Sequence, residues 1–464
     1  MRSQFLNRFV AAFALMVLPT VARGQGLYLP GGGAAHIGMG GASTATPVDS
    51  IGALYWNPAA IGRFGRSEVA VGGAFLMPEI NLESSAPGLF GLRSGRTKSD
   101  SGLVPATSLG IVYQPDESPM TLGMGLNSIA AGGVNFPGDV GNPILAGIGP
   151  LGNVQGPIAA NMLILQMTPT AAYKLGDRLY LGLGPTIDVA VTSFDPAYFG
   201  APDDANGDGI GTFPTGSHSR PFWGAGFRAG LVYSLTNQID LGFGYTSPQW
   251  FEPWLYHART ELGLPRTLKL NVTLPAVYSW GVGYRPTDRL LLAADLRFLD
   301  YANSDLFGTS IVNGGLGWRN VFAAALGSRY QLTDRIAVSG GYVYNDNPIP
   351  SVGTLFNVQA PVITQHTLTT ATTIALTDAV SASLGYAYAF RNTLTGPVRE
   401  ATGVGVSMDT AVHMFTFTMQ FKFGGCGCGK PAVACSDCGC APAPTAASAT
   451  PAGPRQLPGA GAEG

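Results

Sequence analysis

Hydrophobic and polar residues alternate over long stretches of the chain with the period of two that is typical of β-strands. From Leu268 to Tyr284 the even-numbered positions are apolar or aromatic, while odd-numbered positions include Lys269 and Asn271. One face of such a strand suits lipid and the other suits a polar lumen. Pro275 cannot donate a ladder hydrogen bond, so we expect a bulge or break there.

The final strand alternates in the same way. One face carries His413, Phe415, Phe417, Met419, Phe421 and Phe423, and the other carries Thr416, Thr418, Gln420 and Lys422. A closing strand that ends in phenylalanine resembles the signal read by the outer-membrane assembly machinery. That machinery is therefore an expected partner, and outer-membrane lipid is the expected surrounding.

A short pattern recurs between strands: an aromatic residue, one spacer, Leu or Pro, and then a tight polar turn. Five copies begin at Tyr113, Tyr173, Tyr233, Tyr284 and Tyr330, and a sixth that lacks only the tyrosine begins at Ile374. Asp, Asn, Gly and Pro are the residues that tight turns require. A tyrosine before each turn would lie at the membrane interface in an aromatic girdle.

Longer and irregular segments separate these turns, at 85–102, 131–161, 195–221, 253–267, 303–317, 347–360 and 392–408. Short turns at one end and long loops at the other are typical of outer-membrane barrels. Six turns that join strands in pairs, with one further strand at each end, give about 14 strands. The predicted fold is all-β: a 14-stranded antiparallel transmembrane β-barrel over residues 67–423, with both termini periplasmic. A soluble β-sandwich would not explain the strict order of short and long connections.

Composition supports a membrane protein. Charged residues make up 12% of the 464 residues, about half the ~25% usual in soluble domains. The net charge is −2 with scattered Lys and Arg, so no nucleic acid is expected as a partner. After the first residues no apolar run is long enough for a membrane-spanning helix, which leaves a closed barrel as the way to satisfy backbone groups in lipid.

Residues 1–24 have the features of a secretory signal peptide. Arg2 and Arg8 precede an apolar stretch from Phe9 to Val21, and small residues at Ala22 and Gly24 suit cleavage after Gly24. The apolar stretch is shorter than the ~20 residues that a spanning helix needs.

Residues 25–66 do not alternate and are rich in glycine. Within them an apolar stretch from Ile51 to Ile61 is interrupted by Asn57 and Pro58. With so little charge, this segment is predicted to pack inside the lumen as a hatch.

A family resemblance rests on this region. The run Gly40 to Ala45, then Asp49, and then Tyr55, Trp56, Asn57, Pro58, Ala59 and Ala60 resembles the hatch of the FadL-type long-chain fatty-acid transporters, which include importers of toluene. The similarity extends from about Leu27 to Phe423, through segments such as 241–248, 274–284 and 340–346.

The resemblance implies a mechanism. A hydrophobic small molecule is caught by an outer groove, passes to a pocket above the hatch, and leaves sideways into the membrane through a gap in the wall. The family's gap arises from a kink in the third strand, which corresponds to Thr121 to Ala131 here. No cofactor is implied, and a monomer is expected because a closed barrel leaves no free edge.

Candidate ligand-binding residues come from the hatch and from the glycine-rich loop 131–161. The candidates for the outer groove are Phe136, Ile144, Leu145, Ile148, Leu151 and Ile158, and those for the inner pocket are Tyr55, Trp56 and Phe64. For most of them taken singly, ordinary packing is the commoner role. A fatty-acid carboxylate would need a cation, for which Arg220, Arg228 and Arg297 are the candidates.

One segment resembles the start of a calcium loop. Asp204, Asn206 and Asp208 place oxygen ligands at alternate positions before Gly209, but the twelfth position is Thr215 in place of glutamate. A solvated turn and a calcium site both remain open.

All five cysteines lie in the tail 424–464, at Cys426, Cys428, Cys435, Cys438 and Cys440, before a Pro/Ala-rich end. Disulfides or an intermolecular link are expected in the periplasm, with a soft metal as the lesser alternative. The tail supports an alternative function, a structural barrel anchored through its cysteines. An enzyme is not expected, since none of the five histidines lies in a recognisable nucleophile motif.

Overall fold

The computed structural model describes residues 26–88, 91–146, 157–207, 209, 211–217, 219–397 and 403–423. The predicted signal peptide, the cysteine tail, Ile148, Leu151 and Asp208 lie outside these residues. Within them, no helix is long and apolar enough to cross a membrane.

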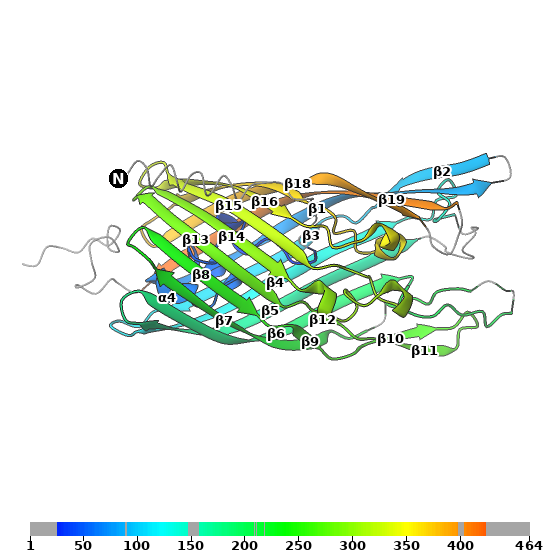
Figure 1. Cartoon of the computed structure of the whole chain (residues 1–464), viewed down its shortest axis with the longest axis horizontal. Coiled ribbons are helices and arrows are strands. Elements are labelled where there is room, and N and C mark those ends of the chain that lie inside the picture. The colour runs from blue at the N-terminus through cyan, green and yellow to red at the C-terminus, as the bar shows by residue number, and fades with distance from the viewer. Residues whose placement is uncertain are drawn as a thin grey trace, which may run out of the picture. The chain divides into compact units, whose positions relative to one another are not determined.

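The described chain forms a closed antiparallel β-barrel (Figure 1). Its strands are β1 (Ser67–Gly88), β2 (Gly91–Lys98), β3 (Val104–Tyr113), β4 (Met120–Phe136), β5 (Ile158–Leu175), β6 (Leu179–Asp195), β7 (Phe222–Ser234), β8 (Ile239–Thr246), β9 (Gln249–Phe251), β12 (Thr273–Leu274), β13 (Val277–Thr287), β14 (Leu290–Leu299), β15 (Val321–Gln331), β16 (Ile336–Asn345), β17 (His366–Ala375), β18 (Val380–Pro397) and β19 (Gly405–Phe423). The first and last strands close the wall, with Ser67 opposite Phe423 and Ser85 opposite Gly405.

The number of strands agrees with the prediction. The main sheet contains 17 strands, but β2 with β3, β8 with β9, and β12 with β13 are each one interrupted strand of the wall. Joining these three pairs leaves 14 strands around the barrel. The break between β12 and β13 falls at Pro275, as expected, and the neighbouring strand is interrupted beside it at Pro248.

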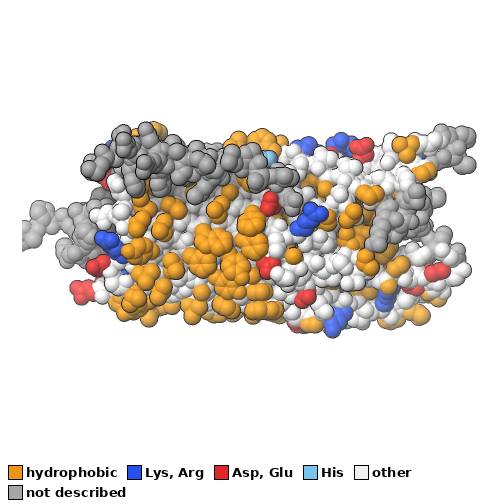
Figure 2. Space-filling view, viewed as in Figure 1, with side chains coloured by type: hydrophobic (Ala, Val, Ile, Leu, Met, Phe, Trp, Pro, Cys, Tyr) orange, Lys and Arg blue, Asp and Glu red, His pale blue; other side chains and the backbone are white. Residues whose placement is uncertain are grey.

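All six predicted turns connect neighbouring strands: β3 to β4, β5 to β6, β7 to β8, β13 to β14, β15 to β16, and β17 to β18. Of the tyrosines before them, Tyr113, Tyr173, Tyr233 and Tyr330 have exposed side chains. In Figure 2 hydrophobic side chains gather over β7, β8, β13 and β14, as expected of a surface that faces lipid.

Three of the predicted irregular loops instead contain extended hairpins. In the segment 392–408, β18 and β19 pair from Asn392–Thr410 to Pro397–Gly405. The segment 85–102 contains the end of β1 and all of β2, which pair from Asn81–Lys98 to Gly88–Gly91. The segment 253–267 contains β10 (Trp254–Arg259) and the start of β11 (Pro265–Leu270), which form a separate two-stranded sheet. Long connections need partners for their backbone groups, and strand pairing supplies them.

The N-terminal segment, residues 26–66, contains three short helices: α2 (Ala34–Ile37), α3 (Ser50–Tyr55) and α4 (Ala60–Phe64). It is almost wholly buried, and its hydrogen-bond partners lie on strands around the whole wall, including β3, β7, β14, β17 and β19. Glycines allow this close approach. A Cβ atom on Gly327 would lie 2.3 Å from the Met39 carbonyl oxygen, and one on Gly341 would lie 2.3 Å from the Gly40 nitrogen.

Four short 3-10 helices complete the long connections: η1 (Tyr301–Asn303), η2 (Ile311–Asn313), η3 (Ser351–Gly353) and η4 (Leu355–Asn357). The connections that contain them contribute residues to a cavity inside the barrel.

Candidate functional site

An apolar cavity of about 480 Å³ lies between the N-terminal segment, the wall and the long connections. Residues 26–30 form one side of it, and Leu76, Ala131 and Met162 are among the wall residues that line it. The long connections contribute a further set, which includes Tyr198, Phe199, Phe213, Phe307, Leu316 and Phe356. A mostly apolar concave site with a few polar groups is typical of small-molecule sites.

The predicted outer-groove residues form a packed cluster and do not line this cavity. Phe136, Ile144, Leu145 and Ile158 are all buried and contact one another within one hydrophobic cluster. Ile80 belongs to both the cluster and the cavity lining, so the two are adjacent. The positions of Ile148 and Leu151 lie outside the described residues.

The predicted hatch residues Tyr55 and Trp56 contact residues that line the cavity but do not line it themselves. The Tyr55 hydroxyl donates to the Leu29 carbonyl oxygen at 3.3 Å, and the Trp56 Nε1–H donates to the Pro30 carbonyl oxygen at 3.3 Å. Both bonds are longer than typical ones, so they hold residues 29–30 weakly. Phe64 packs elsewhere, with Leu54 and Ile61, and also does not line the cavity.

Asn57 fastens the N-terminal segment to the wall. Its Nδ2 group donates to the carbonyl oxygens of Thr44, at 2.7 Å, and Leu231, at 3.0 Å, while its Oδ1 accepts from the Ala59 N–H at 3.0 Å. Pro58 and Ala59 lie against Gly182 of β6, where an added Cβ would be 2.3 Å from the Ala59 nitrogen. Asparagine, proline and alanine at these positions therefore have a positioning role.

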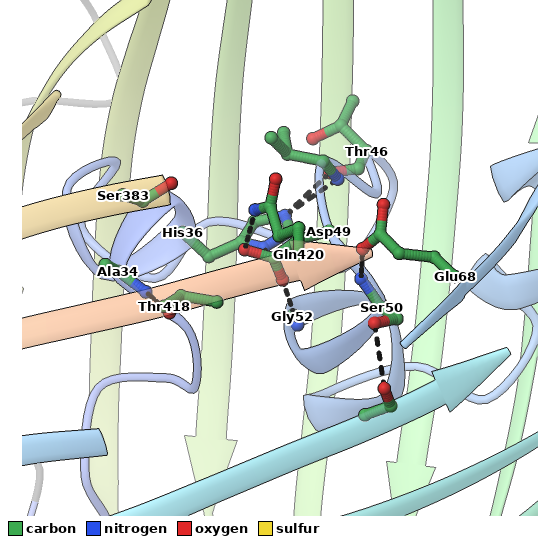
Figure 3. A network of polar contacts seen from close by, with 12 residues as sticks. Ala34, His36, Thr46, Asp49, Ser50, Gly52, Glu68, Ser383, Thr418 and Gln420 are labelled. Carbon is green, nitrogen blue, oxygen red and sulfur yellow. Dashed lines mark hydrogen bonds and ion pairs between the residues drawn. The ribbon is translucent and has the colours of Figure 1, made fainter. Parts of the chain in front are cut away.

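A second network holds the middle of the N-terminal segment (Figure 3). The Asp49 carboxylate accepts from the Gly52 N–H at 2.7 Å at the start of α3, and lies 3.4 Å from His36 Nδ1 and 3.4 Å from Gln420 Nε2. Burial opposes ionisation of Asp49, but His36 and the Gly52 N–H outweigh it, so the pKa of this carboxyl lies below its ordinary value. The network couples the segment to β19 through Gln420.

The three candidate arginines are all engaged away from the cavity. Arg228 donates to the carbonyl oxygens of Leu54, at 2.9 Å, and Tyr55, at 2.7 Å, and also contacts Gln166, which in turn donates to Asp188. Arg297 donates to Asp295 at 2.8 Å and to the Gly41 carbonyl oxygen at 2.6 Å. Arg220 is exposed and pairs with Glu252 at 2.6 Å.

These contacts form a buried charged layer against the N-terminal segment, and none of its residues lines the cavity. Arg228, Asp188, Arg297 and Asp295 are all buried. The Arg297 guanidinium also lies 4.3 Å from the centroid of the Trp56 ring. An apolar molecule gains nothing by entering such a layer, because it would displace hydrogen-bonded groups without replacing their partners.

Pairing between β3 and β4 is interrupted beside the cavity. The two strands pair only from Tyr113–Leu122 to Ser108–Asn127, and the register of β4 shifts between Ser128 and Ala130. Contact resumes where the Asp100 N–H donates to the Asn135 carbonyl oxygen at 2.7 Å. We call the intervening stretch, 101–106 against 129–134, the wall window. The register shift falls within the range that the resemblance indicated.

The N-terminal segment occupies the wall window from inside. The Leu29 N–H donates to the Ile129 carbonyl oxygen at 2.9 Å, at the irregular point of β4. Val104 on one side of the window, and Ala131 with Gly132 on the other, both line the cavity. The cavity therefore reaches the wall window directly, beside the first residues of the N-terminal segment.

The calcium-like loop has internal partners. Asp204 Oδ1 accepts from the Gly209 N–H at 3.3 Å, and Asp203 Oδ2 accepts from the Glu261 N–H at 2.8 Å. Among the described residues no His, Cys, Asp and Glu side chains are grouped so that they could hold a metal ion. Because Asp208 lies outside that set, calcium binding stays a prediction.

None of the candidate ligand-binding residues that the structure describes lines the cavity, whose lining comes from strands, from the long connections and from residues 26–30. The aromatic residues of the connections, such as Tyr198, Phe199 and Phe307, carry no pattern that distinguishes ligand contact from packing.

Comparisons with known proteins agree with this geometry. Residues 15–424 match the family described as outer membrane protein transport protein (OMPP1/FadL/TodX). The long-chain fatty acid transport protein of Escherichia coli (strain K12) is 22% identical over 427 residues, covering 81% of this chain and 90% of that protein. The protein of that name from Salmonella typhi is 20% identical over 429 residues, with the same coverage of both chains.

Solved structures share the fold. The toluene transporter TodX of P. putida superposes with a TM-score of 0.63 at 17% identity, covering 85% of this chain and 99% of TodX. A Pseudomonas aeruginosa FadL homologue gives a TM-score of 0.62 at 14% identity, covering 86% of this chain and 100% of the homologue. The chain belongs to the OMPP1/FadL/TodX family of outer-membrane transport proteins.

Proposed function

We propose that the protein is a passive channel for hydrophobic small molecules, such as fatty acids or aromatic hydrocarbons, which releases its ligand sideways into the membrane. One observation carries the proposal: an apolar cavity without charged residues in its described lining reaches the wall window. The long connections deliver the ligand to the cavity from outside the cell.

The energetics favour this route. A ligand the size of an aromatic side chain buries roughly 150–250 Å², which is worth about 4–6 kcal/mol at ~25 cal/mol per Å². Lipid tails offer a similar apolar environment, so passage from the cavity through the window costs little. Passage along the barrel axis would instead require the ligand to displace the N-terminal segment, which Arg228 and Arg297 hold through hydrogen bonds to its carbonyl oxygens. No energy source is needed for the lateral path.

Residues 26–30 act as the gate in this proposal. They are held to the wall by the hydrogen bond from the Leu29 N–H to the Ile129 carbonyl oxygen, and to α3 and its C-terminal end by the hydrogen bonds from Tyr55 and Trp56. The Leu27 N–H also donates to the Tyr301 hydroxyl group at 2.8 Å. A ligand that displaces this short stretch breaks the hydrogen bonds to Ile129 and Tyr301, which have ordinary lengths, and the two longer ones from Tyr55 and Trp56. The rest of the hatch stays fastened through Asn57 and the Asp49 network.

The organisation of the chain follows from the same proposal. Residues 1–24 are the signal peptide, 25–66 the hatch, 67–423 the barrel, and 424–464 a periplasmic tail. The short-turn end, where β1 begins and β19 ends, faces the periplasm. Insertion uses the outer-membrane assembly machinery, and the closed sheet is a monomer with no edge for a further strand.

Uptake by cells that lack their own hydrophobic-compound channel tests the proposal. Gly132 lines the cavity, and an added Cβ there meets nothing within 4 Å, so Gly132→Trp should fill the cavity without a clash. We expect wild type to raise uptake of labelled toluene or oleate and this variant to lose the gain.

The matched control is Gly340→Trp. Gly340 is also a strand glycine, its Cβ would meet only Ser328 Oγ at 3.9 Å, and it does not line the cavity. Equal loss in both variants, or no uptake by a folded wild-type barrel, would contradict the proposal. Deleting residues 426–464 distinguishes the proposed channel from the alternative of a barrel anchored through its cysteines, since a channel should keep its uptake without the tail.

A further inference from the structure

The cavity carries no charge on the residues that the structure describes. None of its described lining residues is Lys, Arg, His, Asp or Glu. The amide groups of the lining are largely used: Gln359 Nε2 donates to the carbonyl oxygens of Ala159, at 3.1 Å, and Pro196, at 2.7 Å, and Asn345 Nδ2 donates to Thr364 at 3.2 Å. A ligand therefore meets no side-chain cation here.

Arg228 Nε and Arg297 Nε and Nη1 are buried without a hydrogen-bond partner among the described residues, but neither arginine lines the cavity. Turning either guanidinium group toward the cavity would break the hydrogen bonds of its other nitrogen atoms. If Arg228 turned toward the cavity, the carbonyl oxygens of Leu54 and Tyr55 would lose their donor. If Arg297 turned, the Asp295 carboxylate would lose its cation. Leaving a buried charge or carbonyl group without its partner is strongly unfavourable.

Neutral hydrogen-bonding groups are still present. The hydroxyl groups of Tyr28, Tyr198 and Thr410 belong to lining residues, are buried, and have no partner within the described structure. A hydroxyl group can bond a neutral oxygen of a ligand, but it supplies no countercharge. Burying an ionised carboxylate without a cation costs far more than burying a neutral polar group.

We propose that this cavity accepts uncharged ligands, namely hydrocarbons and their neutral ester, ketone or alcohol derivatives, and rejects carboxylates. The inference rests on the proposed function and narrows it. It also separates this chain from the fatty-acid transport named for its curated relatives. The selection comes from the uncharged lining of the cavity.

A matched pair of ligands tests the selection. Octanoate and its methyl ester differ mainly in charge, and equilibrium dialysis of the detergent-solubilised full chain measures the binding of each. Gly132→Trp fills the cavity, so the binding that it retains comes from the detergent micelle and is subtracted. Gly340→Trp is the control for the added tryptophan and should bind both ligands as the wild type does. At pH 7 we expect the ester to bind on the order of 100-fold more tightly than octanoate.

The pH dependence of octanoate binding needs no variant. If only the protonated acid enters, its apparent affinity should fall about tenfold for each pH unit between 6 and 8, well above a carboxyl pKa of roughly 4–5. A flat affinity between pH 6 and 7 would mean that a cation outside the described residues, such as the amino terminus left by signal cleavage, pairs with the carboxylate. That result would overturn the selection.

A gain of function completes the test. Thr367 of β17 lines the cavity, so Thr367→Lys adds the missing cation, and we expect it to narrow the ratio of ester to acid affinity at least about tenfold. Equal binding of both ligands by wild type, abolished by Gly132→Trp, would overturn the selection and leave the channel standing. Absence of cavity binding for both ligands would refute the proposed function itself.

Discussion

Asn57→Ala should release the N-terminal segment from the wall while the barrel stays folded. The substitution removes three hydrogen bonds: one to Leu231 of the wall and two within the N-terminal segment, to Thr44 and Ala59. At ~1 kcal/mol net for each bond, local opening of the segment becomes about 3 kcal/mol more favourable, which is roughly a 100-fold change in its opening equilibrium. The strands keep their own ladder hydrogen bonds, so their protection should not change.

Hydrogen exchange measured by mass spectrometry is the assay. Peptides that cover α2 to α4 should exchange roughly 100-fold faster in Asn57→Ala, with peptides from β14 to β16 unaffected. Asn142→Ala is the matched control, because Asn142 is also buried and donates to Leu82, at 3.0 Å, and to Thr97, at 3.1 Å, outside the N-terminal segment. Unchanged exchange in α2 to α4, or the same acceleration in the control, would refute the positioning role of Asn57.

Three further predictions concern acid, packing and the tail. Because the folded-state pKa of Asp49 lies below 3.8, its stabilisation of the segment is fully present above that pH and lost as the pH falls through the lower folded value. Exchange protection of α3 should therefore hold from pH 7 to 5 and decline below about 4, and Asp49→Asn should be less protected at pH 7 and lose the decline. Gly327→Ala should lower the free energy of releasing the segment by about 1–3 kcal/mol, because its Cβ atom would lie 2.3 Å from the Met39 carbonyl oxygen. Protease resistance of the N-terminal segment should fall accordingly, while the control variant Gly340→Ala should leave it unchanged. Deleting residues 426–464 should leave toluene and ester uptake intact, and loss of uptake from a correctly inserted barrel would favour the anchoring function.

The wall of the barrel was predictable because its determinants are local. Alternation in the strand around Trp280, the six polar turns and the phenylalanine-rich final strand each depend on neighbouring residues, and each predicts its element without knowledge of the rest. The break at Pro275 was predictable for the same reason, since a missing N–H group disrupts a ladder wherever the strand lies. The β1–β2 hairpin was missed because the sequence of β2 is mostly polar. The stretch from Leu268 to Leu270 does alternate, but it belongs to β11 of a separate sheet and not to the predicted strand that runs to Tyr284.

The roles of single residues were not predictable. In the sequence Trp56 and Phe64 resemble ligand-binding aromatic residues. In the structure Trp56 donates a hydrogen bond to the Pro30 carbonyl oxygen, and Phe64 packs with Leu54 of α3 and Ile61 of α4. Phe136 and Ile158 similarly pack into a closed cluster. Sequence shows that such side chains are apolar, but whether they contact a ligand or one another depends on which segments meet.

The sequence alone therefore determined a closed 14-stranded barrel with an irregular N-terminal segment, because periodicity and turn chemistry act over a few residues. The tertiary structure decided where the cavity lies, which part of the wall lacks pairing, and that the candidate arginines are already engaged. Those features arise between residues far apart in the chain: Arg297 meets the Gly41 carbonyl across 256 positions, and Leu29 meets Ile129 across the lumen. Contacts of this kind form only when the barrel closes around the segment, so no local pattern encodes them.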